Sequence, residues 1–214
     1  MEEFLDLLRN DHHSFDQGKL EDHIGNEPFT LLAKWLREAI EKQVSEPNAM
    51  SISTIGLDGF PHARIVYLKE LLEDGPIFYT NYASDKGKSI EANPNIQALI
   101  FWPGLERQIR IMGAAEKVPE EMSDTYFQSR PWGSKIGAWA SHQSEVLASR
   151  EELEERVHEL ALKYPVEVPR PPHWGGYLLR PIQIEFWQGR RSRLHDRIVF
   201  ELEEGSWKIY RKNP

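Results

Sequence analysis

A series of short segments in which apolar and polar residues alternate constrains the fold most strongly. Such alternation has the period of a β-strand that is buried on one side. Turn signals separate several of these segments, for example Asp58-Gly59, Pro103-Gly104 and Glu204-Gly205. The predicted strands are 50–56, 62–69, 76–81, 96–102, 107–118, 174–180, 182–188, 197–202 and 206–210. Strands joined by tight turns pair antiparallel, so the pattern predicts an antiparallel barrel.

Helical patterns occur in groups between the strands and do not alternate with them one by one. Residues 30–44 carry an apolar face, and the residues that form it are Leu32, Trp35, Leu36, Ala39 and Ile40. Ser84 and Ser149 are suited to capping helices at 84–91 and from 149 onwards, and a further helix is expected at 119–128. The expected fold is therefore mainly β with added helices (α+β), built around an antiparallel barrel.

The composition indicates a soluble globular protein of 214 residues, with 40% hydrophobic and 28% charged residues. A net charge of −8 argues against a nucleic-acid partner, so an anion site must be a local concentration of positive charge. The chain has no cysteine, signal-peptide h-region or membrane-length apolar run, and we expect a cytoplasmic protein with no membrane association. We expect one domain, 1–214, with a mobile N-terminal arm at 1–27 and the barrel with its helices at 28–214.

A strand that runs into a basic turn near the C-terminus is the first candidate site. The strand 182–188 ends at Gly189, and positions 190–197 then contain four arginines and one histidine. Arginine presents a rigid fork of donors to phosphate or carboxylate, and histidine can exchange a proton near neutral pH. Arg193, His195 and Arg197 could therefore bind an anion and act beside it. The alternative is a solvated basic turn between two strands.

A second group of anion-binding residues lies in the middle of the chain. Tyr126 and Arg130 are four residues apart, so they share a helix face, and Ser134 follows after a turn. A phenol, a guanidinium and a hydroxyl would suit a phosphate group. Further polar residues in or beside apolar segments are Arg64, Lys69, Lys86, Arg107, Gln108, Arg110, Gln143 and Ser144. For each of them alone, a surface ion pair or a helix cap is the alternative.

Standard nucleotide and nucleophile motifs are absent from the sequence. There is no G-x-G-x-x-G, no P-loop and no G-x-S-x-G, and the acidic residues lack metal-ligand spacing, so we expect no metal site. The His12-His13 pair has no third ligand at a suitable spacing. The residues alone therefore predict a β-barrel protein that binds a phosphorylated ligand.

Taken together, several stretches of the chain resemble the pyridoxine (pyridoxamine) 5′-phosphate oxidases. They are 46–50 (EPNAM), 64–69 (RIVYLK), 78–81 (FYTN), 105–108 (LERQ), 126–131 (YFQSRP), 136–139 (IGAW), 143–144 (QS), 174–177 (WGGY), 185–189 (EFWQG) and 193–197 (RLHDR). They occur in the family's order from about residue 28 to the C-terminus. So many motifs in sequence make the resemblance specific.

The resemblance implies an FMN-binding split β-barrel of antiparallel Greek-key type that forms a homodimer. It implies oxidation of pyridoxine 5′-phosphate or pyridoxamine 5′-phosphate to pyridoxal 5′-phosphate, with O2 as acceptor and release of H2O2, and of NH3 from the amine. The residues that it assigns to FMN are Arg64, Ile65, Val66, Tyr67, Leu68, Lys69, Tyr79, Thr80, Lys86, Gln108, Gln143, Ser144, Trp187 and Arg197. Those that it assigns to the substrate are Arg9, His12, Lys69, Tyr126, Arg130, Ser134, Arg193, Leu194 and His195, with Arg193 and His195 in catalytic roles.

Three positions depart from the family pattern. Asp85 stands where arginine is usual, next to Lys86, and a carboxylate cannot bind phosphate. His12 stands near a position that can be tyrosine in an arm that includes Arg9, and Lys212 stands where leucine is usual. The same barrel could also belong to a non-catalytic flavin- or vitamer-binding protein, or to a nicotinamide-dependent flavin reductase. Retention of both anion-binding groups favours the oxidase, because a storage protein needs no second anion site.

Overall fold

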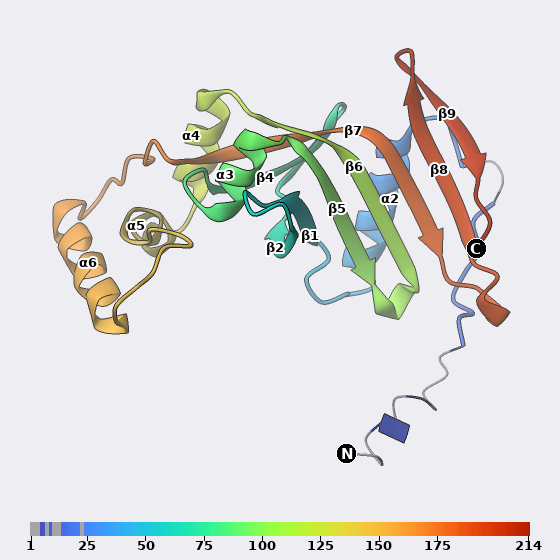
Figure 1. Cartoon of the computed structure of the whole chain (residues 1–214), viewed down its shortest axis with the longest axis horizontal. Helices are drawn as coiled ribbons and strands as arrows, with labels where there is room; N and C mark the ends of the chain where they lie inside the picture. The colour runs from blue at the N-terminus through green and yellow to red at the C-terminus, as the bar shows by residue number, and fades with distance from the viewer. Residues whose placement is uncertain (1–4, 7–8, 10–13, 22–23) are drawn as a thin grey trace. The chain divides into compact units, whose positions relative to one another are not determined.

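The computed structural model describes residues 5–6, 9, 14–21 and 24–214, so His12 lies outside the described residues. Within them, nine strands form one sheet (Figure 1). The strands are β1 (Ala49–Ile55), β2 (Pro61–Tyr67), β3 (Glu70–Leu72), β4 (Gly75–Asn81), β5 (Asn95–Trp102), β6 (Arg107–Lys117), β7 (Trp174–Gln188), β8 (Asp196–Glu203) and β9 (Ser206–Arg211). Their order is β2-β1-β5-β6-β7-β4-β3, with β8 paired to β7 and β9 to β8. The predicted antiparallel pairing is confirmed for β1–β2, β1–β5, β3–β4, β4–β7, β7–β8 and β8–β9.

The helices begin where the local sequence favours a helix start. They are α2 (Pro28–Glu41), α3 (Asp85–Ala92), α4 (Glu120–Ser129), α5 (Trp132–Ala140) and α6 (Arg150–Lys163). The hydroxyls of Ser84 and Ser149 accept hydrogen bonds from the backbone N–H groups of Gly87 and Glu152, so both predicted caps are confirmed. Pro28 occupies the first turn of α2, where its fixed φ suits a helix.

The chain divides into two compact units, and the expectation of a single domain stays a prediction. The first unit comprises 1–47, 100–110 and 183–214. Its core includes Trp35 of α2, whose ring meets the edge of Phe186 at 5.2 Å, and Phe200 of β8, whose ring lies 5.7 Å from Phe186. Aromatic pairs of this kind contribute large buried areas to small cores.

The second unit comprises 48–99 and 111–182. One of its apolar clusters consists of Phe127, Ile136, Val168 and Trp174, and another of Ile77, Val118 and Leu178. The first cluster fixes α4 and α5 against the start of β7. This arrangement matters because α4, α5 and β7 carry several of the candidate site residues.

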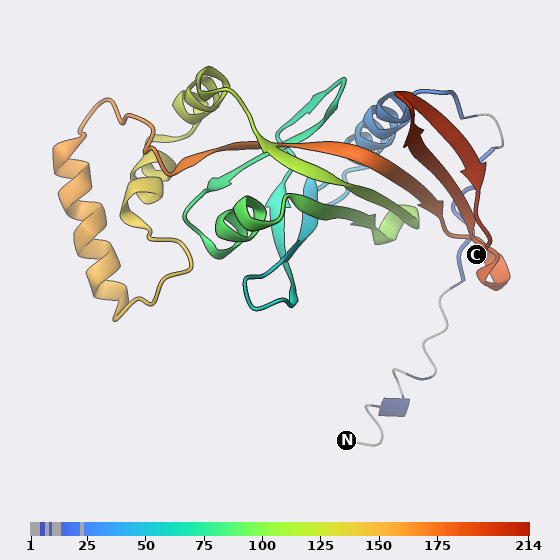
Figure 2. The same cartoon turned by 45° about the horizontal axis from the view of Figure 1, so that its top comes forward.

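Several elements differ from the sequence prediction. The strands predicted at 174–180 and 182–188 are one continuous strand, β7, across Pro181 (Figure 2). A Cβ at Gly113 would lie 1.9 Å from the carbonyl oxygen of Arg180. The absence of a side chain at Gly113 therefore allows this part of β7 to approach it closely. Helix α5 was not predicted, because Pro131 indicates the end of the helix predicted at 119–128, whereas it also immediately precedes the first turn of α5.

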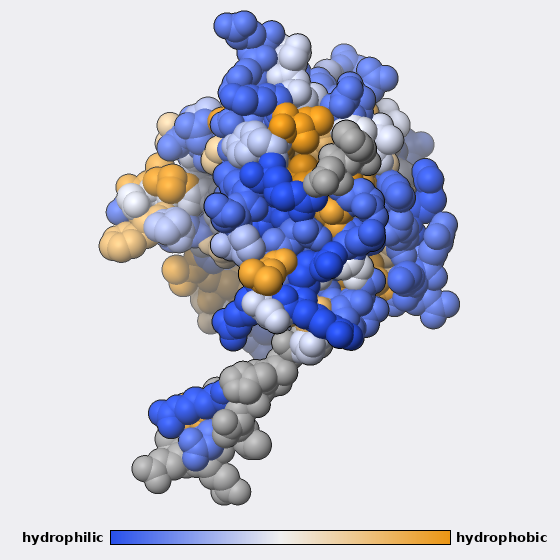
Figure 3. Space-filling model, turned by 90° about the vertical axis from the view of Figure 1, so that its right-hand side faces the viewer, coloured by the Kyte–Doolittle hydropathy of each residue, from blue (hydrophilic) through white to orange (hydrophobic). Residues whose placement is uncertain are grey.

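Most of the surface on one side of the molecule is hydrophilic (Figure 3). The face drawn in Figure 3 is mainly hydrophilic, with hydrophobic residues in small separate patches. Among the described residues, no helix is both long and apolar enough to span a membrane.

Candidate active site

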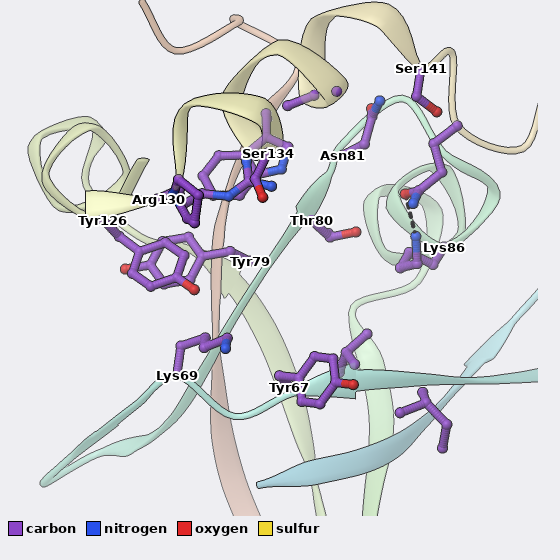
Figure 4. Close-up of a pocket in the computed structure, with 17 residues that line it drawn as sticks. Tyr67, Lys69, Tyr79, Thr80, Asn81, Lys86, Tyr126, Arg130, Ser134 and Ser141 are labelled. Carbon is purple, nitrogen blue, oxygen red and sulfur yellow. Dashed lines mark hydrogen bonds between the residues drawn. The ribbon is translucent and has the colours of Figure 1, made fainter. Parts of the chain in front are cut away.

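A cavity of about 660 Å³ in the second unit brings together half of the residues that the resemblance assigns to FMN and substrate. Strands β2 and β4 and helices α3, α4 and α5 contribute to its wall (Figure 4). Its lining residues are Ile65, Val66, Tyr67, Lys69, Tyr79, Thr80, Asn81, Lys86, Tyr126, Arg130, Pro131, Ser134, Gly137, Ala138, Ser141, Gln143 and Trp174. The cavity therefore holds two cationic regions, one at Lys86 and one at Arg130.

The first region is built around the buried Lys86 in the first turn of α3. Its Nζ donates a hydrogen bond to Oε1 of Gln143 at 2.7 Å, drawn as a dashed line in Figure 4, and another to the Oγ of Ser84 at 3.0 Å. Burial lowers the pKa of Lys86 to about 8; the charge of Arg64 lowers it as well, whereas that of Asp85 raises it. The free amine form is therefore accessible at mildly alkaline pH.

Arg64 and Asp85 complete the electrostatics around Lys86. Arg64 donates to the Oγ1 of Thr54 at 2.9 Å, and burial lowers its pKa while Asp85 opposes that shift. Asp85 itself is exposed. Arg64 is close enough to lower the pKa of Lys86, so the two cations favour an anion between them, and Asp85 reduces their net positive charge.

The second region is a set of four residues, Lys69, Tyr126, Arg130 and Ser134, called the phosphate clamp after the role that the sequence predicts for it. The guanidinium of Arg130 lies over the ring of Trp174, 4.5 Å from its centroid. Burial lowers the pKa of Arg130, although the nearby Tyr126 opposes this effect. Its Nη1 is buried and has no hydrogen-bond partner within the part of the chain that the structure describes. A buried donor without a partner is costly, so this atom is suited to an anionic acceptor from outside the chain.

A stack of aromatic rings supports the clamp. The rings of Tyr79 and Tyr126 are stacked, with centroids 3.9 Å apart and an interplanar angle of 13° (Figure 4). Trp174 lies nearly parallel to both rings, at 10° to Tyr79 and 4° to Tyr126. The Tyr79 hydroxyl donates a 2.5 Å hydrogen bond to Glu70.

The first unit contains the basic turn, where Arg193 and His195 flank the exposed Leu194. The backbone N–H of Arg190 donates to Nδ1 of His195 at 3.1 Å, so the neutral imidazole carries its proton on Nε2. Partial burial lowers the pKa of His195, and the charge of Arg193 lowers it further. His195 is therefore neutral at physiological pH and presents an N–H donor.

Aromatic rings surround His195. Its ring lies 4.7 Å from that of Trp187 at a tilt of 42°, and Phe15 meets both rings edge-on, at 5.2 Å from His195 and 5.7 Å from Trp187. Backbone N–H groups of Gln17 and Leu20 donate to the side chains of Glu106 and Asp196, which fixes this stretch of the arm. Phe15 was not predicted, because a lone aromatic residue in a polar arm has no periodicity to mark it.

The remaining candidate residues lie outside the cavity's lining. Leu68 is buried in the second unit, and Ser144 is exposed with φ of 76°. In the first unit, Arg197 forms an ion pair with the buried Glu185 at 2.8 Å. Gln108 is half-buried in β6, and Arg9 pairs with Asp6 at an exposed position. Their predicted contacts with FMN or substrate stay predictions.

Sequence comparison identifies the family to which this site belongs. The family described as "Pyridoxamine 5'-phosphate oxidase" matches residues 36–164. The chain belongs to the pyridoxamine 5′-phosphate oxidase family. Residues 174–214 also match the "Pyridoxine 5'-phosphate oxidase C-terminal dimerisation region" of this family.

Relatives that match nearly the whole chain support the same assignment. The pyridoxine/pyridoxamine 5′-phosphate oxidase of Actinobacillus pleuropneumoniae serotype 5b is 49% identical over 210 residues, covering 98% of this chain and 99% of the relative. The protein of the same name from Flavobacterium johnsoniae is 51% identical over 208 residues, covering 95% and 97%. The prediction of an enzyme of the oxidase family is confirmed.

Solved structures of the family show the same fold. PhzG from Burkholderia lata 383, in complex with tetrahydrophenazine-1-carboxylic acid, superposes with a TM-score of 0.86 at 34% identity, covering 90% of this chain and 95% of that one. A pyridoxamine 5′-phosphate oxidase-related, FMN-binding protein from Nostoc punctiforme has a TM-score of 0.69 at 17% identity, covering 86% and 96%. The predicted split β-barrel, mainly β with added helices, is confirmed.

Across the described residues, no group of three or more His, Cys, Asp or Glu side chains could hold a metal ion. The donors at the cavity are ammonium, guanidinium, amide and hydroxyl groups, which suit phosphate. They fit a cofactor that carries its own phosphate, as FMN does.

Proposed function

We propose that this protein is an FMN-dependent oxidase that converts pyridoxine 5′-phosphate or pyridoxamine 5′-phosphate to pyridoxal 5′-phosphate. Oxygen is the electron acceptor, H2O2 is released, and the amine substrate also yields NH3. The observation that carries the proposal is the presence of two cationic regions in one cavity, at Lys86 and at Arg130. One suits the phosphate of the cofactor and the other that of the substrate.

The residues around Lys86 are proposed to bind the FMN phosphate. Arg64 and Lys86 supply positive charge, and Gln143 already accepts a hydrogen bond from Lys86. Charge-assisted hydrogen bonds to phosphate are short and about twice as strong as neutral ones. Arg64, Lys86 and Gln143 would hold FMN by its phosphate, and the flavin would supply the hydride-accepting and oxygen-reducing chemistry that the oxidation of the substrate's 4′ carbon requires.

The protein's own residues bind and orient the substrate. The phosphate clamp binds its phosphate, with the buried Nη1 of Arg130 as a donor that has no partner in the described chain. Arg193 and His195 are proposed to act on the pyridine ring. The Nε2 proton of His195 can be donated in a hydrogen bond, and the Arg193 guanidinium can stabilise negative charge that develops in the transition state.

The function is tested with the purified protein, supplied with FMN and then with pyridoxamine 5′-phosphate in air. We expect a yellow protein with one FMN per subunit, and one H2O2 released for each pyridoxal 5′-phosphate formed. A protein that takes up FMN but releases no peroxide would instead be a binding protein. Flavin reduction by a nicotinamide cofactor, without turnover of the phosphorylated vitamers, would identify a flavin reductase.

The affinity for FMN should fall as the pH rises above about 8. The pKa of Lys86 without ligand is about 8, so above that pH its amine is largely neutral and FMN binding must take up a proton. The FMN phosphate is already fully ionised there, since its second pKa is about 6. Fluorescence titration from pH 7 to 9.5 should therefore show the FMN Kd rising, at most about tenfold per pH unit.

Lys86→Met is the matched variant for this pH dependence. It should bind FMN more weakly at pH 7 and lose most of the change between pH 7 and 9.5, because the titrating group is gone. The same pH dependence in wild type and variant would assign it to another group.

The protein is also proposed to form a homodimer with FMN at the subunit interface. Residues 174–214 match the family's dimerisation region, and the β1–β2 hairpin exposes large apolar side chains. They are Ile55, Leu57, Phe60, Ile65 and Tyr67. Two of them, Ile65 and Tyr67, also line the cavity, so a partner that covers them would border the cofactor.

Dilution should therefore release FMN. Sedimentation is expected to show a dimer at micromolar concentration, and dilution to monomer should lower flavin occupancy, because binding and assembly are linked. A stable monomer with undiminished FMN affinity would contradict the interface proposal.

A further inference from the structure

A carboxylate lies next to the phosphate clamp without belonging to the cavity's lining. Glu70 borders a separate cavity of about 510 Å³, together with residues of α4. Tyr126 lines both cavities, so its ring stands between the anion site and the neighbourhood of Glu70. A negative charge beside a phosphate site opposes phosphate binding, so the charge of Glu70 alone does not favour the clamp.

The position of Glu70 is set by strand pairing. Glu70 in β3 lies opposite Ile77 in β4, and Tyr79 is two residues further along β4. Side chains two residues apart on a strand share a face, so Glu70 and Tyr79 are diagonal neighbours. The 2.5 Å hydrogen bond from the Tyr79 hydroxyl to Oε1 of Glu70 follows from this register.

That hydrogen bond is the directional contact of Tyr79, the ring that lies nearest to both other rings of the stack. Tyr79 stacks on Tyr126 at 3.9 Å, Trp174 lies parallel to both, and Arg130 lies over Trp174 at 4.5 Å. Stacked rings tolerate sliding, because offset arrangements over a range of distances have similar energies. A hydrogen bond to a carboxylate is short and directional, and therefore restricts where Tyr79 can lie.

We propose that Glu70 is a positioning residue for the substrate phosphate: it fixes Tyr79 and, through the stack, holds Tyr126 in the wall of the clamp. This inference rests on the proposed function, because it assumes that the clamp binds the phosphate of a pyridoxine vitamer. In this role Glu70 touches neither the phosphate nor the flavin and acts through Tyr79 and Tyr126.

Glu70 has two separable effects on the clamp, one of position and one of charge. Burial raises the pKa of Tyr126, and the charge of Glu70 contributes to the same shift, so the carboxylate is felt at the clamp. Glu70→Gln removes the charge and keeps an oxygen that accepts from Tyr79. Glu70→Ala removes both charge and acceptor. The difference between the two variants isolates positioning.

The experiment measures the Kd of pyridoxal 5′-phosphate and of pyridoxal by calorimetry, using FMN-loaded wild type and variants. Glu70→Gln should bind pyridoxal 5′-phosphate at least as tightly as wild type. Glu70→Ala should bind it about tenfold more weakly than Glu70→Gln, the scale of one misplaced hydrogen bond to a charged group. Neither variant should change the affinity for pyridoxal, which has no phosphate. In turnover, Glu70→Ala should raise KM for pyridoxamine 5′-phosphate and change kcat little.

Three further variants are measured in the same way. Tyr79→Phe removes the donor of the same hydrogen bond and should weaken the binding of pyridoxal 5′-phosphate as much as Glu70→Ala does. The double variant, Glu70→Ala with Tyr79→Phe, should bind it no more weakly than either single variant. Tyr79→Phe alone keeps the test decisive if Glu70→Ala does not fold. Glu121→Gln is the matched control, because Glu121 lines the same second cavity as Glu70, and it should bind both compounds like wild type.

Equal affinities of Glu70→Ala and Glu70→Gln for pyridoxal 5′-phosphate would overturn the inference while leaving the proposed function intact. Additive losses in the double variant, or equal losses for pyridoxal, would overturn it as well. A wild-type protein that binds pyridoxal as tightly as pyridoxal 5′-phosphate would overturn both the proposed function and this inference.

Discussion

His195→Ala is expected to retain FMN and to lower kcat by on the order of a hundredfold, the usual cost of removing one preorganised donor. The expectation follows from the proton on Nε2, which the Arg190 N–H enforces by occupying Nδ1. An alanine cannot present that donor to the substrate. The measurements are the flavin spectrum and kcat with pyridoxamine 5′-phosphate at saturation, and Arg193→Ala should behave in the same way.

Arg191→Ala is the matched control for these two variants. Arg191 belongs to the same basic turn, but its guanidinium pairs with Asp16 at an exposed position. Its removal should leave kcat near that of wild type, because an exposed ion pair contributes little to the stability of the fold. If His195→Ala lost flavin and kept its activity per bound flavin, His195 would belong to the cofactor site instead.

The elements that local sequence determines were predicted well. Ser84 and Ser149 cap α3 and α6 because a serine hydroxyl satisfies a free N–H of the first turn, and that rule needs only the neighbouring residues. Strands β1 and β2 follow from period-two alternation and the Asp58-Gly59 turn. The short strand β3 was missed because Glu70–Leu72 has too few residues to show a period.

The site shows the same division between local and tertiary information. Arg130 and Tyr126 were predicted to act together from a shared helix face, and the structure places both on one cavity. The shared face is wrong, because α4 ends at Ser129 and Arg130 follows it in an extended conformation. The bond between Glu70 and Tyr79 depends on the register of β3 against β4, and the contact of Phe15 with His195 joins segments far apart in sequence. Neither could be predicted from residue type, because pairing and docking decide them.

The second large effect is expected at Arg130, where alanine should weaken binding of the phosphorylated substrate by about tenfold to a hundredfold. The substrate phosphate carries about −1.5 to −2 charges near neutral pH. Each hydrogen bond to a charged group contributes about 1.5–3 kcal/mol, and the buried Nη1 of Arg130 has no other partner in the described chain. FMN should remain bound, because Lys86 and Arg64 provide a separate cationic region.

The measurement is kcat/KM for pyridoxine 5′-phosphate and for unphosphorylated pyridoxine, with wild type and Arg130→Ala. Wild type should strongly prefer the phosphorylated compound, and the variant should narrow that preference because only one of the two substrates loses a contact. Lys135→Ala is the control: Lys135 is a cation on α5 that donates to the carbonyl oxygen of Gln128 and does not line the cavity. It should leave both values unchanged. An equal reduction for both substrates in Arg130→Ala would mean that Arg130 supports the cavity and does not recognise the phosphate.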